Sequence, residues 1–172
     1  MRKAFSRVDV WQLARTQGEQ EGSAALNEFV RLLSDLPEQP ARMVQWQLAG
    51  ETDSHGRPFL NVHAHTTLVL ECQRCLTLFD YSLQAHTRVQ LVKTEEELAD
   101  ESVEEDPDVP DRVLGSAHFD VLAFVEDELI LALPYVPKHE VCPSLPDELE
   151  SAQGSDSRRP SPFSVLSELK KD

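Results

Sequence analysis

Hydrophobic and polar residues alternate along two stretches of the chain that flank a short polar loop. Between Leu60 and Leu70 the even positions are mostly apolar, and between Phe79 and Leu91 the odd positions are mostly apolar. A period of two is typical of a strand with one buried face. We predict that the two strands pair antiparallel as a hairpin with both apolar faces on one side, because a slip of one residue would turn one face into water.

The polar face of this hairpin holds candidate binding residues. Pairing Leu70 with Phe79 places His63 opposite His86 and Asn61 opposite Arg88. Imidazoles and a guanidinium on a flat face are suited to stacking and hydrogen bonding with unpaired RNA bases. The alternative is the solvated face of a one-sided antiparallel sheet. With one arginine from the preceding turn and one from the hairpin tip, the candidate contacts are Arg57, His63, Arg74, His86 and Arg88.

Shorter patterns predict the elements before this hairpin. Val44, Trp46 and Leu48 alternate with glutamines and predict a third strand, so that three consecutive strands form a meander. Upstream, Ser23 is a suitable N-cap for an amphipathic helix that ends before Pro37. The core-facing side chains expected on that helix are Leu26, Phe29, Val30 and Leu33. The short apolar segment 9–14 fits either an edge element or a lead-in.

A second amphipathic helix is predicted after the hairpin, with Asp120 as its N-cap and Pro134 as its stop. Its apolar side carries Leu122, Val125, Leu129 and Leu133. Asp127 and Glu128 fall on the opposite side, where we interpret them as a solvated face, because no base, nucleophile or metal ligand lies at a fixed spacing from them.

These elements predict one α+β domain over residues 1–142, an antiparallel meander with a cysteine-bearing hairpin, covered by helices on one face. An acidic insert at 94–111 interrupts it, where Thr94 and Glu97 form a capping box for a short helix. Residues 143–172 are rich in Pro, Ser, Asp, Glu and Gly, which is typical of a flexible, disordered linker. The linker ends in a short amphipathic segment with Phe163, Leu166 and Leu169.

The charge of the chain is concentrated in the insert. The net charge is −15, and the ten acids between 94 and 111, with no Lys or Arg, leave −5 for the remainder. This balance excludes a protein that coats nucleic acid by electrostatics alone, although a local basic face is compatible with it. No apolar run approaches the ~18 residues of a membrane helix, and the first residues lack the apolar core of a signal peptide. We expect a soluble cytoplasmic protein with neither a membrane nor a small-molecule substrate as its partner.

Several short blocks occur in an order that resembles a known family. The blocks are Glu71–Leu76, Phe119–Leu122, Val125–Pro134, Pro137–His139 with Cys142, and Pro162–Leu166. Their ordered combination resembles the YceD-like family, the large ribosomal RNA subunit accumulation proteins, over most of the chain. The resemblance implies a role in the production or accumulation of 23S ribosomal RNA. We expect a non-enzymatic factor that acts by binding RNA or a ribosome-biogenesis protein.

The cysteines depart from one pattern of that family, in which a second close cysteine pair follows the helix. This chain has His139 and Cys142 there, in addition to Cys72 and Cys75 at the hairpin tip. Three sulfurs and one imidazole suit a closed tetrahedral zinc site with two ligands from each loop.

Three other interpretations of the cysteines stay open. Cys72 is in register with the apolar face of its strand, so it fits a small buried residue, and Cys142 fits a plain loop thiol. A thiol redox enzyme that uses Cys72 and Cys75 is a functional alternative. It is disfavoured because a hairpin turn offers no helix dipole to stabilise a thiolate. A zinc-stapled protein adaptor is the third.

Overall fold

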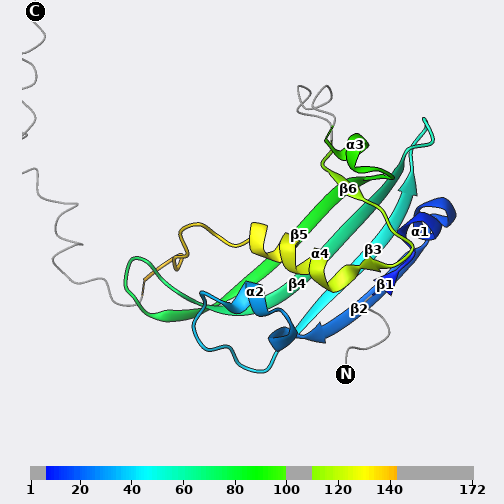
Figure 1. Ribbon diagram of the computed structural model, residues 1–172. Helices are drawn as coiled ribbons and strands as arrows, with labels where there is room; N and C mark the ends of the chain where they lie inside the picture. The colour runs from blue at the N-terminus through cyan, green and yellow to red at the C-terminus, as the bar shows by residue number, and fades with distance from the viewer. Residues whose placement is uncertain (1–6, 100–109, 143–172) are drawn as a thin grey trace, which may run out of the picture.

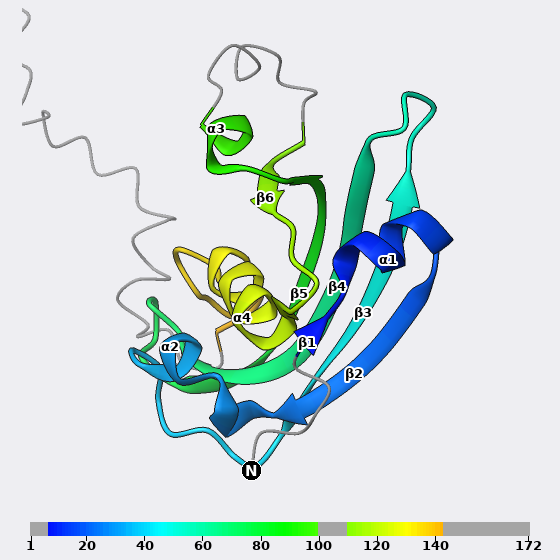
Figure 2. The ribbon, with the colours of Figure 1, turned by 45° about the vertical axis from the view of Figure 1, so that its right-hand side comes forward.

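The computed structural model describes residues 7–99 and 110–142, which build a curved five-stranded sheet with helices on one face (Figures 1 and 2). The strands are β1 (Arg7–Val8), β2 (Glu19–Ala25), β3 (Met43–Thr52), β4 (Pro58–Glu71), β5 (Leu78–Val92), β6 (Arg112–Leu114) and β7 (Phe119–Asp120). The helices are α1 (Val10–Thr16), the 3-10 turn η1 (Leu26–Glu28), α2 (Val30–Leu33), α3 (Glu95–Leu98) and α4 (Val121–Leu131). The sheet order is β2-β3-β4-β5-β6, and β1 pairs separately with β7.

The predicted meander and its register are confirmed. β3, β4 and β5 pair antiparallel in sequence order. Leu70 lies opposite Phe79, His63 opposite His86 and Asn61 opposite Arg88. The alternation determined this register, because only one pairing puts the apolar positions of both strands on the same face.

That apolar face carries the core, and the helices cover it. Leu60, Val62 and Leu68 of β4 are at most 1% exposed, and they belong to one cluster with Val125 and Leu129 of α4. Figure 2 shows the sheet curving around α4. The predicted α+β class, with helices on one face of an antiparallel meander, is therefore confirmed. The flanking strands β2 and β6, the latter parallel to β5, were not predicted.

Helix α4 forms where Asp120 and the apolar spacing predict it. The Asp120 side chain accepts a hydrogen bond from the Ala123 N–H at 3.1 Å, and the helix ends at Leu131, before Pro134. The face predicted to be solvated is only partly so. Asp127 is exposed, but Glu128 is half-buried and accepts a hydrogen bond from the Thr87 hydroxyl of β5.

The helix predicted to start at Ser23 is wrong in its first part. Ser23 lies in β2, opposite Gln45 of β3, and the apolar residues Leu26 and Phe29 enter the core through η1 and the short α2. Val30, expected in the core, is exposed. The reason is tertiary, because a helix through 19–25 would leave the edge of β3 without hydrogen-bond partners.

The segment whose state the sequence left open becomes helix α1. Asp9 is its N-cap and accepts from the Gln12 N–H at 3.0 Å. The helix packs onto β3 at Gly50, where a Cβ would lie 2.2 Å from the Leu13 carbonyl oxygen, so only glycine allows this approach.

At the start of the acidic insert, α3 has the predicted cap, with the Glu97 N–H donating to Thr94 Oγ1 at 3.2 Å. The Glu97 carboxylate accepts from the Lys93 N–H at 2.8 Å rather than from Thr94. The rest of the insert, residues 100–109, lies outside the described residues. So do the predicted linker and the amphipathic segment within 143–172. None of the helices in the described ranges is long and apolar enough to cross a membrane.

Candidate metal centre

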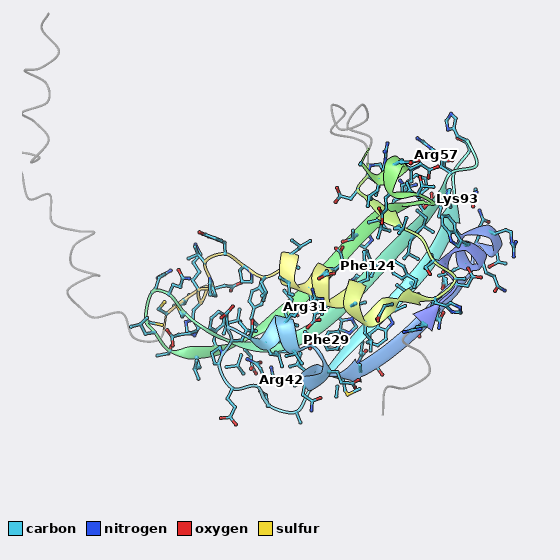
Figure 3. The ribbon with its side chains drawn as sticks, viewed as in Figure 1. Phe29, Arg31, Arg42, Arg57, Lys93 and Phe124 are labelled. Atoms are coloured by element: carbon cyan, nitrogen blue, oxygen red, sulfur yellow. The ribbon has the colours of Figure 1, made fainter. Side chains whose placement is uncertain are left out.

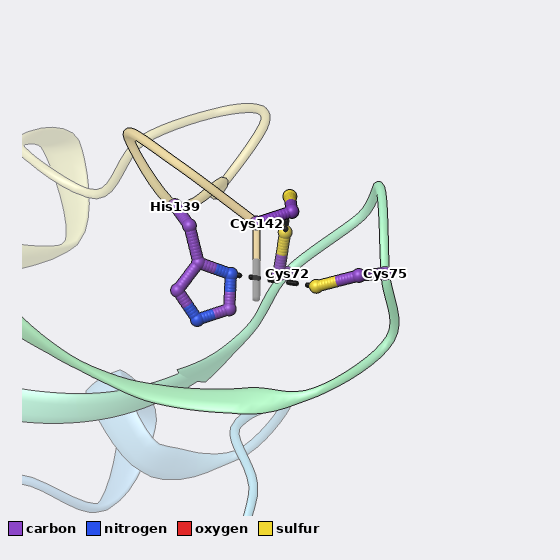
Figure 4. A group of neighbouring side chains, drawn as sticks. All are labelled: Cys72, Cys75, His139 and Cys142. Carbon is purple, nitrogen blue, oxygen red and sulfur yellow. Dashed lines mark hydrogen bonds between the residues drawn. The ribbon is translucent and has the colours of Figure 1, made fainter. Parts of the chain in front are cut away.

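Four sulfur and imidazole side chains converge at the tip of the β4–β5 hairpin. Cys72 directly follows β4 and Cys75 lies in the turn, while His139 and Cys142 come from the segment after α4. Figure 4 shows the two pairs facing each other from the two segments. Their ligand atoms all lie within 4.8 Å of one another. The structure thus brings together the complete set that the sequence singled out, and this set can hold a metal ion.

Backbone hydrogen bonds shape the tip around Cys72. The Leu76 N–H donates to the Cys72 carbonyl at 2.8 Å, and the Cys72 N–H donates to the Thr77 carbonyl at 3.0 Å. Leu76 adopts a left-handed conformation with a φ of 58°, which closes the turn. The Gln73 N–H donates to the Pro137 carbonyl at 2.9 Å, which joins the tip to the segment after α4. The ligands are therefore positioned by main-chain contacts.

The distances between the side chains match a tetrahedral site. Cys72 Sγ lies 3.8 Å from Cys142 Sγ, and Cys75 Sγ lies 3.4 Å from His139 Nδ1. With zinc–sulfur bonds of ~2.3 Å and zinc–nitrogen bonds of ~2.0 Å, a tetrahedral ion separates two sulfurs by roughly 3.8 Å and sulfur from nitrogen by roughly 3.6 Å. A disulfide needs sulfurs about 2.05 Å apart, so the 3.8 Å pair is a pair of free thiols.

Burial and packing hold the ligands in place. Cys72 is fully buried and Cys142 is 9% exposed, whereas Cys75 and His139 are half-buried. The His139 ring stacks at 4.5 Å, centroid to centroid, on Phe79 of β5. The Thr77 hydroxyl lies 3.2 Å from Cys75 Sγ. The sequence analysis did not identify Thr77 and Phe79 as contacts of this site. The only feature of the sequence that could have pointed to them is that they closely follow Cys75.

The electrostatics of the tip favour a thiolate. Burial by itself raises the pKa of the Cys72 thiol, but backbone N–H groups of His139, Cys75 and Arg74 stabilise the anion and lower its pKa to about 5. Burial, followed by hydrogen bonds to Cys75 and Cys72, raises the pKa of Cys142 to about 11. A bound cation is what allows neighbouring thiols to ionise together. The turn offers no helix dipole, as expected, but the N–H groups of Arg74 and Cys75 in this turn stabilise the thiolate instead.

The candidate RNA contacts fall at three separate places. Arg57 and Arg88 lie near one end of the sheet, where both guanidinium groups approach the Phe59 ring, at 5.9 and 3.9 Å from its centroid (Figure 3 labels Arg57). His63 and His86 are cross-strand neighbours in the middle. Arg74 lies at the hairpin tip, and at about 3.3 Å per residue the nine residues from His63 to Cys72 span roughly 30 Å.

Two of these five residues have acidic partners. Arg88 pairs with Glu51 at 2.9 Å, and Arg57 pairs with Asp53 at 2.7 Å. Among the described residues Arg74 is exposed and makes no ion pair. The sequence did not reveal the Arg88–Glu51 pair, because the pairing of β3 with β4 and of β4 with β5 brings the two residues together, whereas Asp53 and Arg57 lie only four residues apart in one turn. Arg74 is the cation of the set that stays available.

Comparison with known proteins bears on these residues. A family model described as Large ribosomal RNA subunit accumulation protein YceD matches residues 60–170. This chain belongs to that family. The matched region contains β4 from its third residue onward, β5, α4 and all four members of the metal centre, whereas α1, β2 and β3 precede it.

A curated relative agrees with the family match. The Large ribosomal RNA subunit accumulation protein YceD of Haemophilus influenzae is 34% identical over 112 residues, which is 59% of this chain and 59% of the relative. The aligned part therefore spans less than two thirds of that relative. No solved structure matches the chain.

Proposed function

We propose that this protein promotes the accumulation of large-subunit ribosomal RNA as a non-enzymatic factor in ribosome biogenesis. The observation that carries the proposal is membership of a family described by that role, over a region that includes the hairpin and the metal centre. The family description is not the name of an enzyme. The factor acts by binding 23S ribosomal RNA or a ribosome-biogenesis protein.

In this proposal Cys72, Cys75, His139 and Cys142 hold one Zn²⁺ ion. Sulfur and nitrogen separations of 3.8 and 3.4 Å support it, as does the stabilised thiolate of Cys72. Four protein ligands leave no coordination position for a substrate, so such an ion is structural. It fastens the hairpin tip to the segment that follows α4.

The proposed working surface is the hairpin tip together with the open face of the sheet. Arg74 supplies an unpaired positive charge at the tip, and His63 and His86 are exposed on the open face. Arg57 and Arg88 contribute less net charge, because Asp53 and Glu51 neutralise them.

We also propose that residues 1–142 form one domain, which the acidic insert at 94–111 interrupts. A single core cluster that runs from Val10 of α1 to Leu129 of α4 supports this. Residues 143–172 would then act as a linker with a short amphipathic end. The family match, which extends to residue 170, supports counting this end as part of the functional unit.

The metal is tested by elemental analysis of protein purified without chelator. We expect about one zinc per chain, because closed structural sites bind tightly. His139→Ala should lose most of this zinc, whereas the matched control His118→Ala, which removes an exposed imidazole outside the site, should keep it. Folded wild-type protein without zinc would refute the metal proposal and leave the role in ribosomal RNA accumulation standing.

The function is tested in cells that lack the gene. We expect Arg74→Glu to restore 23S ribosomal RNA levels poorly, because a reversed charge at the tip repels phosphate or an acidic partner group. Lys93→Glu, an equal charge change at an exposed site at the far end of β5, should rescue fully (Figure 3). Crosslinking of the wild-type protein, with RNA sequencing and proteomics of one pulldown, separates an RNA ligand from a protein ligand. Equal rescue by both variants would show that the tip is not the working surface.

One observation favours the alternative, a thiol redox enzyme that uses Cys72 and Cys75. The lowered pKa of Cys72 is a property of reactive cysteines as well as of metal ligands. Metal-free protein whose dithiol cycles rapidly with glutathione would support the enzyme. Stoichiometric zinc that protects the cysteines from alkylation would exclude it.

A further inference from the structure

Three histidines form a group on the open face of the sheet, away from the cysteine centre. His63 and His65 lie two residues apart on β4 and so project from the same face. His86 of β5 is the direct cross-strand partner of His63. The His63 ring centroid lies 6.1 Å from that of His65 and 6.0 Å from that of His86. His63 thus has the other two imidazole rings as neighbours, one along its own strand and one across to β5.

The rings are free to act as ligands. All three side chains are exposed, and among the described residues none of the three rings has a hydrogen-bonding or ion-pairing side chain. The backbone of His63 and His65 is held between β3 and β5, and that of His86 is paired with β4. Mobile side chains on a rigid strand pair are able to adjust toward an ion without any cost in backbone rearrangement.

The spacing is close to what a shared metal ion requires. An ion held at ~2.1 Å by one nitrogen of each ring brings the ring centroids to roughly 4.5–5 Å from each other. The centroids at 6.0 and 6.1 Å have to move by about 1 Å, which small rotations about the side-chain torsions of exposed residues supply. Cross-strand pairs have their Cβ atoms only ~5 Å apart, so the backbone sets no obstacle.

We propose that His63, His65 and His86 bind a divalent transition-metal ion, such as Zn²⁺, Ni²⁺ or Cu²⁺, on the open face of the sheet. Neutral imidazole is a ligand that suits these ions. Because the site has no thiolate, it should discriminate less strongly among these ions than the cysteine centre does. Three protein ligands leave at least one position toward solvent, which water or an anionic oxygen fills. This is the opposite of the closed cysteine centre, and it does not depend on the proposed function.

The surroundings of the histidines suit such an ion. His63 and His65 line a groove of about 450 Å³ that also includes Glu21, Gln45 and Gln47. In the sheet register Gln47 lies opposite His63 and Gln45 opposite His65. Neither amide hydrogen-bonds to a ring in this structure, but an amide oxygen at these positions is a suitable acceptor for the N–H of a metal-binding imidazole. Glu21, on the adjacent row of β2, adds a negative charge to the same groove.

The experiment is a calorimetric titration of Ni²⁺ into full-length protein as purified without chelator, in a buffer free of imidazole and of added metal. We expect one equivalent of Ni²⁺ to bind, with zinc retained at the cysteine centre in the same sample. His63→Ala removes the central ligand, so its affinity should be at least tenfold weaker. His86→Ala should weaken binding as well, because it leaves only the pair on β4.

The matched control is His55→Ala, which removes an imidazole with a 76% exposed side chain in the β3–β4 turn. It should bind Ni²⁺ as the wild type does. In NMR spectra, Ni²⁺ should broaden the ring resonances of His63, His65 and His86 before those of His55. Wild-type binding no tighter than that of His63→Ala, or an equal loss in His55→Ala, would overturn the proposal. Circular dichroism of each variant verifies the fold.

Discussion

At the hairpin tip, the backbone conformation of one residue, Leu76, shapes the turn that holds Cys72 and Cys75. Its φ of 58° places a leucine in the left-handed region, which costs an L-residue roughly 1–2 kcal/mol relative to glycine. The conformation persists because it lets the Leu76 N–H reach the Cys72 carbonyl. The N–H groups of Arg74 and Cys75 then face Cys72 Sγ and stabilise its thiolate.

Leu76→Gly should therefore be tolerated or should stabilise the protein by up to about 1 kcal/mol, because glycine adopts a positive φ without strain. The control is Leu78→Gly, which removes the same side chain from an exposed position of β5 and should cost about 1 kcal/mol. Urea unfolding of both variants measures the difference. A larger loss in Leu76→Gly than in Leu78→Gly would mean that the leucine side chain, rather than the backbone, matters at the tip.

On the open face, the carboxylate of Glu51 is stabilised by neighbouring hydrogen-bond donors. Its pKa lies below the usual range, chiefly because Arg88 and then Asn61 donate hydrogen bonds to the carboxylate. A carboxyl group whose pKa is lowered by folding stabilises the protein above its unfolded pKa, and the contribution is lost as the pH falls through the folded value.

Wild-type protein should thus be more stable than Glu51→Gln at neutral pH, and the two should converge in strongly acidic solution. The side chains of the pair are 39% and 40% exposed, so solvent screening limits the neutral-pH difference to about 0.5 kcal/mol. Chemical unfolding at both pH values tests this. A difference that grows on acidification would contradict the assignment of the partner.

At the scale of elements, the four-residue helix α2 depends on α4, the longest of the described helices. Helix α2 has no side-chain cap of its own. Instead the buried Glu126 of α4 accepts hydrogen bonds from the Arg31 N–H at 2.7 Å and the Leu32 N–H at 3.2 Å. Its second oxygen accepts from Arg31 Nε at 3.0 Å, and Figure 3 shows Arg31 on α2 beside α4. One carboxylate thus replaces the local cap and joins two elements.

Glu126→Gln keeps the shape but replaces one accepting oxygen with an NH₂ group that meets the donors of α2. We expect a loss of about 1–3 kcal/mol in the free energy of unfolding. Asp127→Asn, which changes the exposed neighbour that pairs only with Arg31 Nη1, should cost no more than about 0.5 kcal/mol. Equal losses in the two variants would show that the charge of Arg31, rather than the helix cap, is what matters.

At the scale of the whole molecule, helix α4 and the segment that follows it are held in place in different ways. Helix α4 is held by the core, through Val125 and Leu129. The residues beyond it are held at the tip, through the Gln73–Pro137 backbone hydrogen bond and the ligand set of the metal centre. The sheet and its helices thus have a core that does not depend on a metal.

Removal of the zinc ion proposed above by a chelator should release the tip while the sheet stays folded. Hydrogen exchange should accelerate at residues 72–77 and 137–142, because their order depends on the ion. The amides of residues 60–70, in the centre of the sheet, should be unaffected and serve as the internal control. Global unfolding on chelation, or no change at the tip, would contradict this division.

The pattern of the sequence by itself determined the central hairpin. The alternation on β4 and β5 has one register that buries both apolar faces, and the structure has that register from Glu71 opposite Leu78 to Phe59 opposite Gln90. Helix α4 was determined equally well, because Asp120 and the apolar spacing act locally. The four side chains that could hold a metal were also named from the sequence, through the resemblance to a family in which a second cysteine pair follows the helix.

The tertiary structure alone decided the rest. Residues 19–25 became a strand because the edge of β3 offered partners, and Glu126 capped α2 from 95 positions away along the chain. The pairing of Arg88 with Glu51 depended on the register of β3 against β4, which the pattern of the sequence had not specified. Local patterns report which face of an element is buried. They do not report which distant group supplies a hydrogen bond, a counter-charge or a neighbouring ligand, because those follow from where the packed elements come to lie.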